Sequence, residues 1–148
     1  MSDFIELYQQ LILDHYKKPR NFHKMEAANR VADGHNPLCG DHFTVYLKLE
    51  NGIVQDISFE GAGCAISTAS ASLMTEAIKG KTETEAEALF KKFHSLVATE
   101  SSPDSSNMGK LTVMAGVRQF PVRVKCATLA WHALHAALAN QVKNVTTE

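Results

Sequence analysis

Two alternating runs of residues joined by Asn51-Gly52 constrain the fold most. Apolar and polar side chains alternate over residues 43–50 and again over residues 53–60. Because successive side chains of a strand point to opposite faces, each run predicts a strand with one buried face. An Asn-Gly pair suits the two-residue turn of a hairpin, in which both residues take positive φ. The sequence therefore predicts an antiparallel hairpin, and a short edge strand is expected at residues 30–32.

Helical spacing of apolar residues predicts the remaining elements. The first helix should end near Lys17, since Pro19 disfavours helical geometry in the residue before it. Gly80 is expected to stop a second helix, and Thr84 with Glu87 is expected to form a capping box at the start of a third. The further helical segments are expected at residues 67–79, 84–97 and 111–117 and from about residue 126 onward.

The position of Pro121 decides where the last helix is expected to begin. Proline has no N–H and a restricted φ, so it is expected to bar a helix through residues 120–124. Residues 98–110, which are rich in serine, are expected to form a loop. The order of helix, strands and several helices predicts the α+β class, a small antiparallel three-stranded sheet with helices packed on one face. The length of 148 residues fits a single domain over residues 1–148.

Composition narrows the classes of function. Lys and Arg number 15 and Asp and Glu number 16, which gives a net charge of -1 and no overall electrostatic signature of nucleic-acid binding. The apolar runs are far shorter than the roughly 20 residues of a membrane-spanning helix. The first residues lack the basic start and apolar stretch of a signal peptide. We therefore expect a cytoplasmic protein with no nucleic-acid or membrane partner.

Three cysteines, Cys39, Cys64 and Cys126, are the main functional clue. An odd number of cysteines without a signal peptide argues against a disulfide framework. Buried inert thiols, a nucleophile and metal ligands remain possible. Each cysteine is predicted at a boundary between elements, where turns can direct its side chain outward. The separations are long and form no compact CxxC motif, so spacing alone leaves open three unrelated thiols.

The surroundings of the cysteines favour metal binding. Thiolates are the form that binds metal, and helix N-termini and nearby cations stabilise them. Cys64 and Cys126 are both expected at helix N-termini, with Arg123 and Lys125 close to the latter. A hydrolase with Cys64 as nucleophile is an alternative, but it needs a histidine base that no position identifies.

An aspartate close to the first cysteine offers a fourth ligand. Gly40 can take a positive φ, so a bend could turn Cys39 and Asp41 toward one centre. Three sulfurs and one carboxylate oxygen suit Zn²⁺, and thiolates also suit iron–sulfur clusters. A purely structural zinc module would use the same ligands.

Four stretches of the sequence resemble the IscU/NifU-type iron–sulfur scaffold family and, within it, the SufU branch. They are residues 11–21, 36–41, 61–70 and 123–127, and they contain all three cysteines in order. The resemblance implies an α+β fold and one exposed site formed by Cys39, Asp41, Cys64 and Cys126. It also implies iron–sulfur cluster assembly, with a pyridoxal-phosphate cysteine desulfurase of the SufS type as sulfur donor. Downstream assembly proteins or apo-proteins would be the acceptors.

Two departures from IscU-type scaffolds bear on the role within this family. Lys125 stands where those scaffolds carry a histidine, which removes a potential cluster ligand. Pro121 is a single proline where the chaperone-docking stretch has two, and residues 95–114 resemble the insertion of the SufU branch. These features favour a zinc-dependent sulfurtransferase that accepts persulfide sulfur over a scaffold for a [2Fe–2S] cluster.

The two roles assign the same residues differently. In the sulfur-transfer hypothesis the four ligands hold Zn²⁺, Cys39 becomes the attacking thiolate, and Arg123 steadies the released anion. In the scaffold alternative Cys39, Cys64 and Cys126 hold iron or a nascent [2Fe–2S] cluster.

Overall fold

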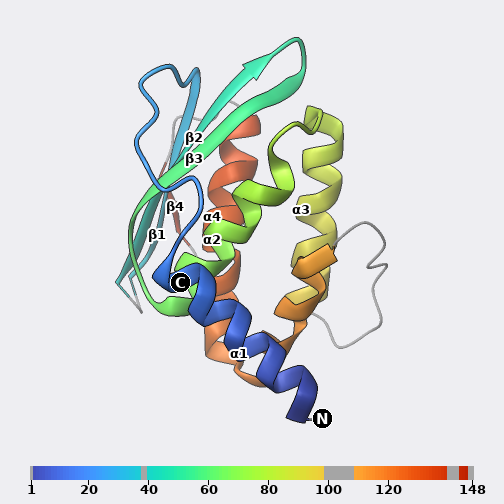
Figure 1. The fold of residues 1–148 in the computed structure, drawn as a ribbon. Coiled ribbons are helices and arrows are strands. Elements are labelled where there is room, and N and C mark those ends of the chain that lie inside the picture. Colours follow the sequence, from blue (N-terminus) through green and yellow to red (C-terminus); the bar gives the residue numbers. More distant parts are fainter. Residues whose placement is uncertain (1, 38–39, 99–108, 140–143, 147–148) are drawn as a thin grey trace.

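The computed structural model describes residues 2–37, 40–98, 109–139 and 144–146. The elements follow one another as α1 (Ser2–Lys17), β1 (Arg30–Asn36), β2 (Asp41–Glu50), β3 (Ile53–Ala62), α2 (Ala65–Ile78), α3 (Glu83–Ala98), the 3-10 helix η1 (Gly109–Gln119), α4 (Pro121–Leu138) and β4 (Asn144–Thr146). The sheet stands on one side of the molecule and the helices on the other (Figure 1). Among these described helices, none has the length and apolar character needed to span a bilayer.

The sheet has the strand order β3-β2-β1-β4. The pairs β1–β2 and β2–β3 are antiparallel, which confirms the predicted three-stranded antiparallel sheet. The short strand β4 was not predicted, and it adds to β1 in parallel. Strand β1 is also longer than expected, because it pairs with β2 from Arg30 opposite Leu47 to Asn36 opposite Asp41.

The hairpin forms where the Asn-Gly pair predicts it. Asn51 and Gly52 have φ values of 56° and 74°, as a two-residue turn with both central residues at positive φ requires. On the inner face of β2, Phe43, Val45 and Leu47 are fully buried. The apolar side chains of the predicted alternation therefore face the core.

The last helix begins five residues earlier than predicted, at Pro121. Proline occupies the first turn of α4, where its missing N–H would have no intrahelical partner and its φ already suits a helix. The expectation that Pro121 bars a helix was therefore wrong. One consequence is that Cys126 lies within the helix, in its second turn, rather than at its N-terminus.

The capping box of the third helix is also displaced from its predicted position. The Thr82 N–H donates to Glu85 Oε1 at 2.9 Å, and the Glu85 N–H donates to Thr82 Oγ1 at 3.1 Å. These reciprocal bonds place the cap at Thr82, so the expected pair Thr84 and Glu87 was wrong. Both pairs satisfy the same Thr-x-x-Glu pattern, which alone does not choose between them.

Helices α2 and α4 pack together under the sheet through a buried polar link. The Ser70 hydroxyl donates to the Ala127 carbonyl at 2.5 Å and accepts from the Trp131 indole N–H at 3.2 Å. Trp131 also stacks on Phe93 of α3, with ring centroids 4.4 Å apart. These contacts tie the first half of α2 to α4 from Ala127 to Trp131, and both helices contribute to the site described next.

Candidate metal centre

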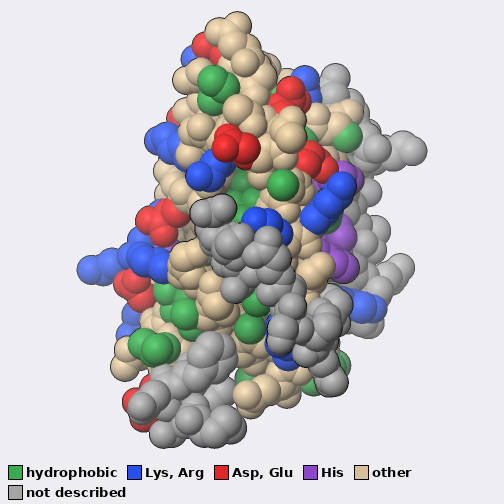
Figure 2. Space-filling model, turned by 90° about the vertical axis from the view of Figure 1, so that its right-hand side faces the viewer, with side chains coloured by type: hydrophobic (Ala, Val, Ile, Leu, Met, Phe, Trp, Pro, Cys, Tyr) green, Lys and Arg blue, Asp and Glu red, His purple; other side chains and the backbone are tan. Residues whose placement is uncertain are grey.

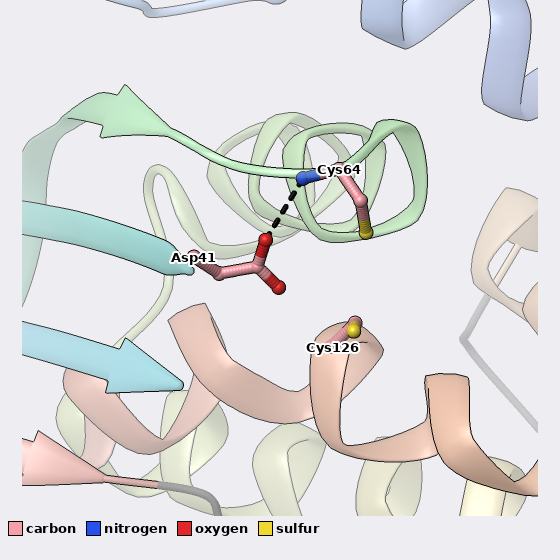
Figure 3. A group of neighbouring side chains, drawn as sticks. All are labelled: Asp41, Cys64 and Cys126. Carbon is pink, nitrogen blue, oxygen red and sulfur yellow. Dashed lines mark hydrogen bonds between the residues drawn. The ribbon is translucent and has the colours of Figure 1, made fainter. Parts of the chain in front are cut away.

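Three of the four predicted ligands come together at one end of the sheet. Asp41 begins β2, Cys64 caps the N-terminus of α2, and Cys126 lies in α4. One ligand atom from each, a carboxylate oxygen or a sulfur, lies within 4.8 Å of those of the other two. Figure 3 shows the Cys64 sulfur and the Asp41 carboxylate directed toward Cys126. The fourth predicted ligand, Cys39, lies outside the described residues.

A tight turn and a hydrogen bond between two distant segments of the chain position Asp41. Gly40 has a φ of 72°, as its predicted bend requires, and its N–H donates to the Asn36 carbonyl at 2.9 Å. Asp41 follows directly and is fully buried. Its Oδ1 accepts a hydrogen bond from the Cys64 N–H at 2.9 Å, drawn as the dashed line in Figure 3. This bond ties the start of β2 to the start of α2.

Close approach of the chain at the β3–α2 junction requires glycine at position 63. A Cβ atom on Gly63 would lie 2.7 Å from Asp41 Oδ1, 2.7 Å from Ser67 Oγ and 2.9 Å from Phe43 Cε2. These separations are well below van der Waals contact, so any larger residue would displace the carboxylate. The glycines before Cys64 therefore do more than end a strand, because Gly63 leaves room for the site.

The Cys64 thiol lies in surroundings that favour its thiolate. Its sulfur accepts a hydrogen bond from the Ser67 N–H at 3.4 Å at the N-terminus of α2, and it lies 3.3 Å from Ser67 Oγ. Hydrogen bonding from Cys126 is the largest cause that lowers the pKa of Cys64, to about 5 from 9.0, with the Ser67 bonds adding to it. Partial burial and the Asp41 charge oppose this lowering of the pKa. The predicted helix N-terminal position of Cys64 is confirmed.

The site is less exposed than the family resemblance implied. Cys126 and Asp41 are fully buried, and Cys64 is half-buried. Cys126 lies in the second turn of α4 and is one of the residues that this helix buries. The Asn36 side-chain amide lies 4.0 Å from the Cys126 sulfur, within the range of a weak N–H···S bond.

The donor set fits a metal ion. Asp41 Oδ2 is buried, and none of the residues that the structure describes forms a hydrogen bond with it. A buried carboxylate oxygen without a partner is costly unless a cation or a donor occupies the space beside it. Two sulfurs and one oxygen, all directed at a common point, are ligands that zinc accepts, and thiolates also bind iron–sulfur clusters. A bound ion would therefore keep the arrangement that Asp41, Cys64 and Cys126 already have.

The two predicted cations take different positions. Lys125 is exposed, whereas Arg123 is half-buried. Arg123 lines a cavity of about 400 Å³ together with Tyr8, Phe120 and Ile66, which lies two residues after Cys64. Of the two cations, Arg123 is the one that lines this cavity.

Tyr8 is a residue of this region that sequence analysis missed. Its hydroxyl is buried, and no hydrogen bond joins it to any of the described residues. Burial is the main cause that raises the pKa of Tyr8 to about 12; the Cys64 charge raises it further, and the Arg123 charge lowers it. The charges of both Cys64 and Arg123 therefore influence the pKa of Tyr8. In the sequence Tyr8 is one of the apolar-face residues of α1, and no pattern separates it from core residues.

The sheet, its covering helices and the thiolate–carboxylate cluster define a class of protein. Residues 7–147 match the NifU-like N terminal domain family, and the chain belongs to that family. It is 45% identical over 135 residues to the zinc-dependent sulfurtransferase SufU of Bacillus subtilis (strain 168), and the match covers 91% of each chain. It is 39% identical over 135 residues to the iron-sulfur cluster assembly scaffold protein IscU of Thermotoga maritima, covering 91% of this chain and 94% of the other.

Solved structures show the same fold. A crystal structure of a proposed iron-sulfur cluster assembly scaffold protein for the SUF system, from Fervidobacterium islandicum, superposes with a TM-score of 0.84 at 36% identity. That match covers 90% of this chain and 97% of the other. The N-terminal part of a NifU-like protein from Brucella abortus superposes with a TM-score of 0.83 at 24% identity, which is a likeness of fold. The predicted family resemblance and the α+β class are confirmed.

Proposed function

We propose that this chain acts in iron–sulfur cluster assembly as a zinc-bound sulfurtransferase that accepts persulfide sulfur from a cysteine desulfurase. The observation that carries the proposal is the convergence of Asp41, Cys64 and Cys126 from three separate elements on one point. Similarity to a relative named as a zinc-dependent sulfurtransferase supports the choice of reaction. We place this activity in the cytoplasm, in one domain spanning the chain.

Each residue of the site has a distinct part in this proposal. Cys39, Asp41, Cys64 and Cys126 would hold Zn²⁺, which when bound keeps the thiols deprotonated and protects them from oxidation. The oxygen donor of Asp41 is harder than the sulfurs, so its bond to a borderline metal is the one most open to exchange. The hydrogen bond from the Cys64 N–H fixes Asp41 Oδ1 and leaves Oδ2 for the ion.

Sulfur transfer requires one thiolate of this chain that is free to attack, so docking of the desulfurase would have to release it from the ligand set. We assign this role to Cys39, which stands between Pro37 and Gly40 in the sequence. Its sulfur attacks the terminal sulfur of the desulfurase persulfide, a new S–S bond forms on Cys39, and the S–S bond of the enzyme breaks. The desulfurase cysteine leaves as a thiolate, so the exchange needs no external oxidant or reductant. Arg123 would steady the released anion.

The partners follow from this chemistry. The donor is a pyridoxal-phosphate cysteine desulfurase of the SufS type, because that class forms a cysteine persulfide. The acceptors are downstream iron–sulfur assembly proteins or apo-proteins, which need sulfur in a transferable form.

Substitution at the carboxylate tests the proposal. Asp41→Ala should abolish stimulation of the desulfurase by the zinc-loaded protein, and Asp56→Ala is the matched control. Asp56 lies on β3 at the surface, where it pairs with Lys79 at 3.5 Å. Undiminished stimulation by Asp41→Ala, in a variant shown to be folded, would defeat the proposed function.

A scaffold role is the second candidate, favoured by the similarity to relatives named as cluster scaffolds. In it Cys39, Cys64 and Cys126 would hold a [2Fe–2S] cluster and pass it to apo-proteins. Anaerobic reconstitution with iron and sulfide separates the two roles. A stable visible chromophore that transfers to an apo-ferredoxin supports the scaffold, and its absence together with zinc-dependent sulfur transfer supports the sulfurtransferase.

A further inference from the structure

A cluster of imidazoles lies between α3 and α4, on the opposite side of the core from the sheet. His94 lies on α3, while His132 and His135 lie on α4, and all three rings surround Phe90. On the face drawn in Figure 2, which α3 covers, histidine side chains gather in one patch. The sequence predicted His132 and His135 to face solvent, but both are half-buried against α3. The proposed sulfur chemistry does not use this cluster.

We propose that His94 and His132 form a second divalent-metal site that binds Zn²⁺ through two imidazole nitrogens, with water completing its coordination. The two ring centroids are 5.5 Å apart and the ring planes cross at 78°. An imidazole nitrogen lies about 2.0–2.1 Å from zinc, which puts each ring centroid about 3.2 Å from the ion and the two centroids about 5.2 Å apart at a tetrahedral angle. The separation of the two ring centroids therefore allows a shared ion, with one nitrogen of each ring turned toward it.

The electrostatic setting of the pair also suits a cation. Metal binds the neutral imidazole, and burial, with smaller contributions from His94 and His135, lowers the pKa of His132 below its ordinary value. The Glu87 carboxylate lies beside the cluster and accepts a hydrogen bond from His135 Nδ1 at 2.9 Å. This carboxylate brings negative charge to the histidine cluster and keeps the His135 ring in place.

Access to the site is open on one side. His94 is exposed, so solvent can reach an ion held between its ring and that of His132. The Phe90 ring packs against His132, with its centroid 5.4 Å from that of His132. The site thus offers two imidazole ligands next to an aromatic ring, and solvent can supply water ligands.

Zinc titration of the zinc-loaded full chain tests the proposal. Calorimetry at neutral pH should show one zinc equivalent beyond the thiolate site, and His94→Ala should weaken that equivalent by at least about tenfold. His94 is exposed, so this substitution leaves the core unchanged. The matched control is His35→Ala, since His35 and His42 form another histidine pair, across β1 and β2, with centroids 5.7 Å apart.

The zinc stoichiometry of the wild-type chain and the two variants decides the proposal. Loss of the additional equivalent in His94→Ala but not in His35→Ala, with zinc-induced NMR shifts at the imidazoles of His94 and His132, supports the site. Retention of the equivalent in His94→Ala overturns the proposal. Absence of any additional zinc in the wild-type chain also overturns it and leaves the two rings as an edge-to-face packing contact.

Discussion

Replacement of Gly63 by alanine separates the packing of the metal centre from its ligands. The new methyl group would lie 2.7 Å from Asp41 Oδ1 and 2.7 Å from Ser67 Oγ. To relieve this overlap the carboxylate must move away from the Cys64 N–H, to which it is now bonded at 2.9 Å. Gly63→Ala therefore disturbs Asp41 without removing any ligand atom.

The magnitude follows from these contacts. Overpacking of a close-packed site costs about 1–3 kcal/mol, and losing a hydrogen bond to a charged acceptor costs about 1.5–3 kcal/mol. Because the two effects share the same atoms they do not add fully, and we expect a net loss of about 2–4 kcal/mol in the free energy of unfolding of the metal-free protein. Zinc affinity should fall by about 10–100-fold, as for other changes that misplace a ligand.

Two assays measure these effects, with Gly34→Ala as the control. Urea unfolding gives the change in stability, and competition with a chromophoric chelator gives the zinc affinity. A Cβ on Gly34 would lie 3.1 Å from Leu129 Cδ1, and its three nearest atoms all belong to Leu129 rather than to the converging ligands. Gly34→Ala should therefore lose some stability and keep its zinc affinity. Unchanged zinc affinity in Gly63→Ala would refute the role of Asp41 as a ligand.

Three further predictions follow. In the metal-free protein, the rate of Cys64 alkylation should be half-maximal near pH 5 rather than near 9.0. Because folding lowers the pKa of Cys64, the contribution of its thiolate to stability is complete above pH 9 and is lost as the pH falls to about 5. A midpoint near 9 would contradict the thiolate environment. Ser70→Ala should cost about 1–3 kcal/mol, because the buried Trp131 indole N–H loses its acceptor; the fluorescence of this single tryptophan reports the shift in urea midpoint, and an unshifted midpoint would argue against the link. Thr82→Ala should cost about 0.5–2 kcal/mol in thermal unfolding while Thr84→Ala stays near neutral, and the reverse order would restore the original capping assignment.

Local signals in the sequence predicted the elements that depend on local geometry. Asn51-Gly52 identified the hairpin because few other pairs take positive φ at both turn positions, and Gly80 ends α2 with a φ of 87°. The prediction of where α4 begins was wrong, and the reason is also local. Proline bars a helix interior but favours its first turn, and the sequence around Pro121 does not say which position it occupies.

Features that depend on distant segments were harder to predict. Strand β4 is three residues long, and its pairing with β1 brings together segments far apart in the chain. The histidine cluster arises from the packing of α3 on α4, so the pattern of a single helix could not show that His132 is half-buried. The resemblance to a family, and not the periodicity of apolar residues, implied that the predicted ligands form one site.

The metal centre illustrates the same limit. Chemistry singled out Asp41, Cys64 and Cys126 as possible ligands, and their long separations left open whether they met. Their meeting depends on the pairing of β1 with β2 and on the position of α2 over α4, neither of which is encoded near the cysteines. The role of Gly63 follows from a close approach that only the folded chain reveals.

Zinc X-ray absorption spectroscopy of the freshly purified protein tests the central claim most directly. If the predicted ligand set holds one ion, the absorption fine structure shows three sulfurs at about 2.3 Å and one oxygen at about 2.0–2.2 Å. Asp41→Ala should replace or remove the oxygen while keeping the sulfurs. A shell of nitrogen and oxygen without sulfur, or a protein purified without zinc or iron, would contradict a metal centre built from these residues.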